Sequence, residues 1–234
     1  KVFGMGLRSL ALWPGIVAGL ALPVDLRQRG SLLLAHRGDE GAARRVIELL
    51  QHKAPPGHAP QALDLKALRE MEPSVQGVAQ AWLLQGEGQI HTVQAMAALA
   101  AQGLALGVHW HWSEPAHAVE THSITSSQGA QPFDWVFDVR GTGARPQWPV
   151  RGVRGEIFWL HAPGHTLSRP CRLLHPRHRV YLVPREGDIV VVGASEIESE
   201  DRSPVSLRST VELLAAAHSV ISELAEARIV HSET

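Results

Sequence analysis

One short strand-like segment carries side chains that could bind an anion. The segment RVYLVPR, residues 179–185, alternates polar and apolar residues. Alternate side chains of a strand share a face, so Arg179, Tyr181 and Arg185 are expected on one face and Val180 and Leu182 on the other. Guanidinium groups grip carboxylates through paired hydrogen bonds, so a phenol between two of them is typical of an anion-binding wall. A solvated face of a sheet is the alternative, and this strand by itself favours it.

Two of the 14 histidines, His109 and His111, have a spacing that can serve a metal ion. In a strand both would point to the same face, and Trp110 and Trp112 would take the other. A zinc site needs at least three protein ligands, and no third ligand stands at a recognisable spacing. A structural role is therefore favoured, a metal-dependent hydrolase is the minor alternative, and no metal ligand is predicted.

A glycine-rich turn, Gly141-Thr142-Gly143, follows a strand-like run, as a dinucleotide-binding turn would. The third glycine of that motif is missing, and Arg145-Pro146 stands where a helix should begin. Taken by itself this is a weak phosphate-loop signal. The chain has no P-loop and no G-x-S-x-G elbow, and no local motif supports a Ser–His–Asp hydrolase.

The composition is that of an ordinary globular protein. The chain has 234 residues, 44% apolar and 19% charged, with a formal net charge of -1, so nothing indicates nucleic acid or an anionic membrane. Cys171 is the one cysteine, which excludes an internal disulfide and favours a reducing, cytoplasmic compartment. The apolar run at residues 16–22 is far shorter than the ~20 residues of a membrane helix, and it is expected to be a helix with a buried face.

Two helices are predicted in the first third of the chain from their caps and periodicity. Asp39 is expected to cap a helix that buries Val46, Leu49 and Leu50 on one face. Asp64 is expected to cap a shorter helix, which must end before the proline at position 73.

Two further helices are predicted later in the chain. Thr92 is expected to cap an alanine-rich helix that ends at Gly107. Ser203 is expected to cap the last helix, with Pro204 at its first position. The apolar stripe of this helix is expected to contain Leu207, Val211, Leu214, His218, Ile221 and Leu224.

Between and after these helices the apolar period changes to two, which predicts strands. The strands are expected at residues 108–112, 134–139, 156–160, 180–183, 189–192 and 228–231. Consecutive strands without intervening helices pair antiparallel, so the predicted class is α/β with α+β character, built on a mixed, largely antiparallel sheet with flanking helices.

Several short phrases, taken in order, resemble the FAD-dependent glycine oxidase and D-amino-acid oxidase family. They are PVRGVRGE at 149–156, YLVPR at 181–185 and VGAS at 192–195, preceded by GEGQIH at 86–91 and VFDVRG at 136–141. The resemblance implies an interleaved two-domain enzyme with FAD as cofactor. Residues 1–87 and 146–234 would form the substrate domain, and residues 88–145 the returning part of the FAD-binding domain.

The same resemblance implies site residues. The backbone near Ala116 would lie beside the adenine of FAD, and the turn at Arg140 and Gly141 would approach the pyrophosphate. Tyr181 matches the tyrosine that helps to hold the substrate carboxylate, whereas Arg179 occupies a position that varies across the family. No catalytic residue is named.

Two family segments are absent from this sequence, the opening G-x-G-x-x-G and the later G-L-R-P. Both ends of the chain are therefore expected to be cut, and these 234 residues alone are expected to bind FAD poorly and to turn over nothing.

The resemblance implies that the parent enzyme oxidises the C–N bond of an amino acid or amine. A hydride would pass to the flavin, the imine would hydrolyse to an oxo acid and ammonia, and oxygen would be reduced to hydrogen peroxide. Within the same class, a quinone-linked dehydrogenase or a sarcosine-type oxidase stays open. A non-catalytic substrate-binding remnant is the alternative from another class. The expected partner is a small amino acid or amine, with no nucleic acid and no membrane span.

Overall fold

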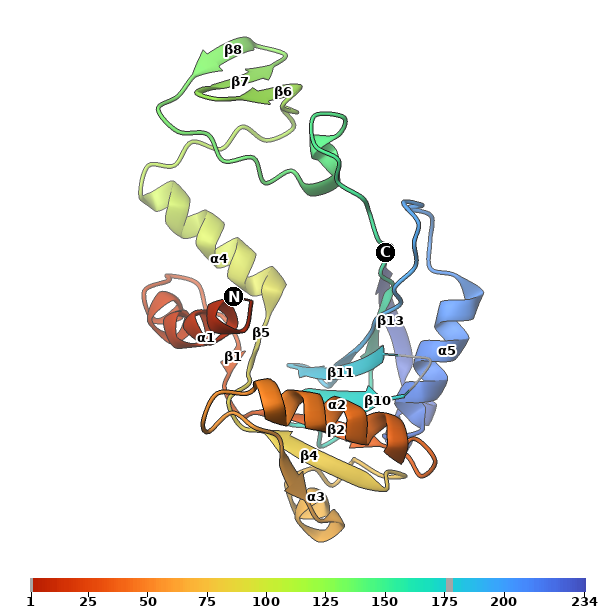
Figure 1. Ribbon diagram of the computed structural model, residues 1–234. Coiled ribbons are helices and arrows are strands. Elements are labelled where there is room, and N and C mark those ends of the chain that lie inside the picture. Colours follow the sequence, from red (N-terminus) through yellow and green to blue (C-terminus); the bar gives the residue numbers. More distant parts are fainter. Residues whose placement is uncertain (1, 176–178) are drawn as a thin grey trace.

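The computed structural model describes residues 2–175 and 179–234, and within them the largest element is an eight-stranded sheet (Figure 1). The strand order is β13-β9-β12-β11-β10-β2-β4-β3. Neighbouring strands are antiparallel except for the parallel pair of β10 and β2, so the predicted mixed, largely antiparallel sheet is confirmed. The strands are β2 (Ser31–Ala35), β3 (Gln61–Leu63), β4 (Gln80–Leu84), β9 (Ile157–His161), β10 (Cys171–Leu174), β11 (Arg179–Arg185), β12 (Ile189–Gly193) and β13 (Arg228–Glu233).

One face of this sheet packs on the main hydrophobic core. Helices α3 (Leu65–Met71) and α5 (Leu207–His218) and the 3-10 helix η2 (Ser222–Glu226) contribute to that core. The strand residues in it are apolar at alternate positions, which is why period-two segments predicted these strands. Its buried members include Leu32, Leu34, Phe158, Leu160, Val180, Leu182, Val190, Val192, Leu213 and Ala217.

Helix α2 (Glu40–Lys53) covers only part of the opposite face. Its Ala43 and Ile47 pack against residues of β2 and β4, including Leu33 and Trp82, in a second and smaller core. Over β11 and β9 the same face carries half-buried residues, of which Tyr181 is one. The sheet is therefore closed on one side and only partly covered on the other.

The middle of the chain forms a separate arm (Figure 1). A short ribbon of β1 (Leu26–Arg27) and β5 (Gln89–Ile90) leads from the main sheet to helix α4 (Thr92–Ala105), and α4 leads to a three-stranded sheet. Few apolar residues of this arm are buried, among them Ala95, Ala98 and Ala144. The remaining elements of the arm are β6 (Ala118–Glu120), β7 (Ser123–Ser126), β8 (Gly129–Pro132) and the 3-10 helix η1 (Gly141–Ala144).

The strands predicted at residues 108–112 and 134–139 are wrong. Neither segment joins a ladder with another described part of the chain. Trp135, Phe137 and Val139 are 80%, 81% and 90% exposed, so the alternation is present without a surface to bury it. Alternation shows that a segment suits a sheet, but a strand forms only where another strand accepts its backbone hydrogen bonds.

The first two helices differ from the prediction in what they bury. Helix α1 (Val2–Ala18) contains Pro14 and has no buried residue, so the buried face predicted for this region is wrong. Helix α2 begins after Asp39 as predicted, but the Asp39 side chain makes no capping bond. Val46 and Leu49 are 38% and 51% exposed, because α2 turns Ala43 and Ile47 toward the sheet instead. Among the described helices, none is both long and apolar enough to traverse a bilayer.

The later two helices have different caps from those predicted. His91, not Thr92, caps α4, and its Nδ1 accepts a bond of 3.4 Å from the backbone N–H of Gln94. Ser206, not Ser203, caps α5. The carbonyls of Ser203 and Pro204 both accept bonds of 2.8 Å from one arginine, Arg154, and this holds them outside the helix.

The late start of α5 also corrects the apolar stripe predicted for it. Leu207 and Val211 are 81% and 59% exposed, and His218 is exposed too. The buried positions of the helix are Ser209, Leu213 and Ala217. Ile221 and Leu224 are buried as expected, but they lie after the helix has ended.

Helix α3 provides a test of capping. The Asp64 carboxylate accepts a 2.7 Å bond from the Ala67 N–H, whereas Asp39 stands at the same position of α2 without such a bond. We expect Asp64→Ala to lower the free energy of unfolding by about 1 kcal/mol and Asp39→Ala to leave it nearly unchanged. Urea unfolding of both variants measures this difference. Equal losses would show that the Asp64 bond contributes nothing specific.

Candidate functional site

Tyr181 lies where alternation placed it. Val180 and Leu182, its neighbours in β11, are 1% and 0% exposed on the core side, and Tyr181 is half-buried on the opposite face. The backbone of Arg179 pairs with Leu174 of β10, but the side chain of Arg179 lies outside the described part of the structure. Of the two predicted substrate-binding residues, the geometry can therefore be given for Tyr181.

The ring of Tyr181 lies over Gly193 of the neighbouring strand. A Cβ added to Gly193 would stand 2.5 Å from the Tyr181 hydroxyl oxygen and 2.7 Å from Cγ2 of Ile157 in β9. No larger residue fits there, so glycine is what allows the phenol to reach across β12. Burial raises the pKa of the Tyr181 hydroxyl above 10, while the nearby Arg185 opposes that shift, so the phenol stays protonated at neutral pH.

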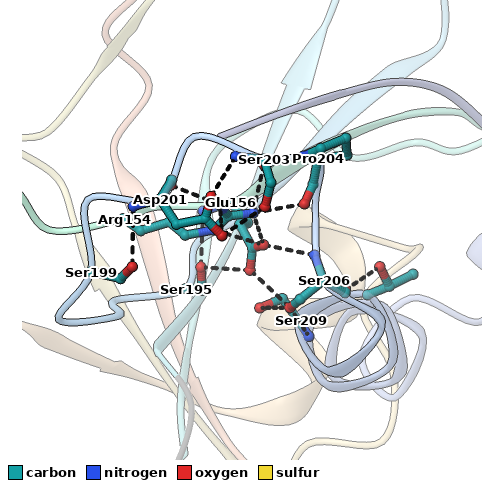
Figure 2. Close-up of polar contacts among 10 residues, drawn as sticks. Arg154, Glu156, Ser195, Ser199, Asp201, Ser203, Pro204, Ser206 and Ser209 are labelled. Carbon is teal, nitrogen blue, oxygen red and sulfur yellow. Dashed lines mark hydrogen bonds and ion pairs between the residues drawn. The ribbon is translucent and has the colours of Figure 1, made fainter.

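A buried carboxylate holds the backbone next to this ring in place. Glu156 directly precedes β9 and is 0% exposed. Its Oε1 accepts bonds from Arg154 Nη2 at 2.8 Å and from the backbone N–H of Ser206 at 2.7 Å, and its Oε2 accepts a 3.1 Å bond from Ser195 Oγ. Figure 2 shows this carboxylate between the arginine and the first turn of α5. Three segments distant in sequence therefore meet at one side chain.

The ionisation of Glu156 depends on these contacts. Burial by itself would raise the pKa of the carboxyl, but hydrogen bonds from Ser209, Arg154, Ser206 and Ser195 outweigh it and lower the pKa to about 2. The α5 N-terminus is a favourable place for an anion, because its first N–H groups lack partners within the helix. Sequence reasoning missed this role, since only the folded chain brings residues 154–156 and 195–209 together.

The residues predicted to contact the cofactor lie in the separate arm, and two of them touch. Arg140 Nη1 donates a 3.3 Å bond to the carbonyl of Ala116, while the same guanidinium holds Asp138 at 2.7 Å. The hydrogen bond from Arg140 lowers the pKa of Asp138 to about 2, so this carboxylate is charged at neutral pH. The Arg140 guanidinium is therefore already bonded to Asp138 and Ala116, so the backbone groups of this segment are the available contacts to a ligand.

Next to this pair is a cavity of about 890 Å³. Gly141, with φ of 57°, and the aromatic rings of Trp135, Phe137 and Trp148 line it. A positive φ favours glycine, and a turn without a side chain allows a phosphate to approach the backbone closely. Glycine at the turn and aromatic walls fit a nucleotide cofactor.

The histidine pair lies elsewhere and does not form the strand face that was predicted. His109 and His111 are exposed on an irregular segment, and His111 Nδ1 lies 3.2 Å from a Glu114 carboxylate oxygen. Among the described residues, no three His, Cys, Asp or Glu side chains converge in a way that could hold a metal ion.

The whole chain, residues 1–234, matches the FAD dependent oxidoreductase (DAO) family, and it belongs to that family. Among curated proteins it is 35% identical over 211 residues to a Rhizobium etli protein that carries the name thiamine biosynthesis oxidoreductase ThiO. That match covers 89% of this chain and 59% of the relative, so the chain spans less than two thirds of the relative's length.

Solved structures with the same fold include two glycine oxidases. The Geobacillus kaustophilus enzyme superposes with a TM-score of 0.82 at 23% identity, over 97% of this chain and 64% of that one. The Bacillus cereus enzyme gives 0.84 at 18% identity, over 99% and 68%. The predicted family and the predicted fold class are both confirmed.

The buried carboxylate gives the first prediction for the site. Glu156→Gln removes the charge that neutralises Arg154, whose side chain is 6% exposed, so we expect the free energy of unfolding to fall by about 3–5 kcal/mol. The control is Glu198→Gln, because Glu198 pairs with Arg151 at the surface and should change stability by less than about 1 kcal/mol. Chemical denaturation of both variants tests this, and equal small losses would contradict it.

The Glu156 carboxylate also predicts how the stability of the fold depends on pH in acid. Because the folded chain holds the Glu156 pKa at about 2, its stabilising contribution is present above the ordinary value of 4.5 and is lost as the pH falls toward 2. In Glu156→Gln this part of the pH dependence should disappear, whereas Glu198→Gln should retain it.

The packing of Tyr181 gives a second prediction. Tyr181 is the single tyrosine of the chain, so the ultraviolet absorbance of tyrosinate follows this ring alone. Its ionisation should occur above pH 10, and Gly193→Ala should shift it back toward 10 by displacing the ring. Gly155→Ala is the control, since a Cβ there meets its nearest atom at an ordinary 3.5 Å. Because the folded chain keeps the proton more tightly, stability should fall as the pH rises above 10.

Proposed function

We propose that this chain is part of an FAD-dependent oxidoreductase that oxidises the C–N bond of an amino acid or amine. Membership of the family over residues 1–234 supports the reaction class. The observation that carries the finer proposal is the half-buried Tyr181 hydroxyl on the partly covered face of the sheet, held across Gly193. A neutral phenol in that position donates a hydrogen bond to a substrate carboxylate.

We assign the parts of the chain accordingly. Residues 1–87 and 146–234, which supply the eight-stranded sheet, form the substrate domain, and residues 88–145 form the returning part of the FAD-binding domain. The backbone at Ala116 and the turn at Arg140 and Gly141 would hold FAD beside the cavity that Gly141 lines. When bound, FAD supplies the two-electron acceptor that amino acid side chains lack.

The residues of this chain orient the substrate. Tyr181, with Arg179 as a second candidate, would hold its carboxylate, and no protein acid or base is assigned. The product imine would hydrolyse to an oxo acid and ammonia, with hydrogen peroxide if oxygen is the acceptor. A buried Cys171 outside any disulfide fits a cytoplasmic protein, and a small amino acid or amine is the proposed partner.

The test is made on the product of the complete gene, since the chain spans 59% of its curated relative. Visible flavin bands in the purified protein, bleached by an amine substrate without air, would support the proposal. Bleaching that oxygen fails to reverse, while a quinone does, would identify a dehydrogenase. A colourless protein that releases no flavin on denaturation would refute the proposal and favour a non-catalytic remnant.

In that enzyme Tyr181→Phe tests the assigned role. The variant loses one hydrogen bond to a charged group, so KM should rise about tenfold while kcat changes little. Steady-state kinetics with a range of substrate concentrations measures both constants. An unchanged KM would contradict a carboxylate role for Tyr181.

A further inference from the structure

The ribbon of β1 and β5 presents polar side chains to the main sheet. Arg27 pairs with Gln89, and the backbone N–H of His91 donates to the carbonyl of Asp25 at 2.9 Å, so the pairing continues one step further. Paired residues share a face of a ribbon, as do residues two apart, which places all four side chains on one face. The His91 ring lies 6.0 Å from the ring of Trp159 in β9, so that face points toward the main sheet.

Several buried polar atoms at this junction have no partner. Gln89 is 8% exposed, and both its amide nitrogen and its amide oxygen are unpartnered. Trp159 Nε1, Arg185 Nη1 and Asp25 Oδ2 are also buried and unpartnered. In the described ranges, every buried side-chain atom without a partner belongs to this junction except one nitrogen of His165. Buried polar atoms are normally satisfied, so a cluster of exceptions indicates partners outside the described residues, such as a ligand or ordered water.

The charges at the junction favour an anion. Asp25 Oδ1 already accepts a 2.8 Å bond from Arg27 Nε, so that pair is neutral overall. Arg185 is half-buried, and burial lowers the pKa of its guanidinium. The negative charge of Asp25 opposes this shift, whereas the positive charge of Arg27 adds to it. Burial and proximity to Arg185 also lower the pKa of His91, against the attraction of Asp25 and of the exposed Glu186, so its ring adds no positive charge at neutral pH. The Arg185 guanidinium and the unpartnered N–H groups of Trp159 and Gln89 at the same junction are donors suited to a carboxylate.

This donor set lies on the same face of β11 as Tyr181. The two residues are four positions apart on one strand, which is about 13 Å between their Cα atoms at ~3.3 Å per residue. A small molecule with an acidic group at each end can therefore contact Tyr181 and Arg185 at the same time. Asp25 Oδ2 and Gln89 Oε1 then provide acceptors for an amine N–H near one of those groups.

We propose that Arg185, Trp159 and Gln89 form a second carboxylate subsite, and that the substrate is an amine or amino acid with two carboxylates. Tyr181 holds one carboxylate, and the Arg185 subsite holds the other. This inference rests on the proposed function, because it assumes that Tyr181 faces the substrate.

Binding of unreactive ligands to the complete flavoprotein tests the inference. Succinate and succinamate have the same length but differ in one carboxylate, and the flavin absorbance reports their binding. Succinate should bind at least tenfold more tightly than succinamate to the unaltered enzyme. Equal dissociation constants would show that the junction does not recognise a second carboxylate, and would overturn the inference without refuting the oxidase. Absence of flavin would instead refute the proposed function.

Two variants test which residues cause the preference for succinate over succinamate. Arg185→Met should remove the preference for succinate, and Trp159→Phe, which keeps the ring and loses the N–H, should reduce it. Arg151→Met is the control, because Arg151 is 74% exposed and pairs with Glu198 at the surface. A preference that survives Arg185→Met would overturn the assignment, as would a change confined to flavin affinity. If Arg185→Met does not fold, Trp159→Phe and the comparison of ligands on the unaltered enzyme still decide.

Discussion

The arrangement around Tyr181 depends on how the fold neutralises one buried charge. Glu156 is fully buried, and an isolated carboxylate in such a place is costly unless donors surround it. The donors come from the arginine two residues earlier, from the turn after β12 and from the first turn of α5. Satisfying that carboxylate fixes the end of β12, where Gly193 accommodates the phenol. The position of the phenol follows from a network that does not touch it.

The main sheet and the arm differ in how their elements are stabilised. The main sheet has apolar cores on both faces, whereas the arm from Thr92 to Trp148 buries few side chains and exposes large ones such as Trp112 and Trp135. Secondary structure in proteins is stabilised chiefly by packing, so the arm should open locally at a lower free energy than the sheet. The proposed cofactor contacts all lie in the arm, and a bound nucleotide would cover part of this exposed surface.

Local patterns in the sequence predicted the strands in which alternate apolar residues are buried on one face of the main sheet. β9, β11 and β12 appear close to their predicted positions, and Asp64 caps its helix as expected. β13 also appears where it was predicted, although all six of its residues are exposed and it is held by pairing with β9. The failures share a cause: whether 134–139 becomes a strand depends on a partner, and where α5 begins depends on an arginine 50 residues earlier.

The site was predictable to a similar extent. Alternation put Tyr181 and Arg185 on one face, and the family resemblance singled out Tyr181 and the turn at Gly141. The ribbon that brings Gln89 and Asp25 over Trp159 could not be foreseen, because its register is a property of the assembled sheet. The contact between Arg140 and Ala116 likewise joins positions that no local period relates.

The parallel pairing of β2 with β10 has a consequence for how the chain acquires its structure. Leu32 of β2 pairs with Cys171 of β10, about 140 positions later, and such long closures slow folding. During synthesis, β2 and β4 leave the ribosome long before the strand that completes their sheet, and the whole arm emerges in between. The nascent chain must therefore carry an unpaired strand edge, with three consecutive leucines at 32–34, while the arm is translated. An exposed strand edge of this kind is prone to pair with other chains until β10 covers it.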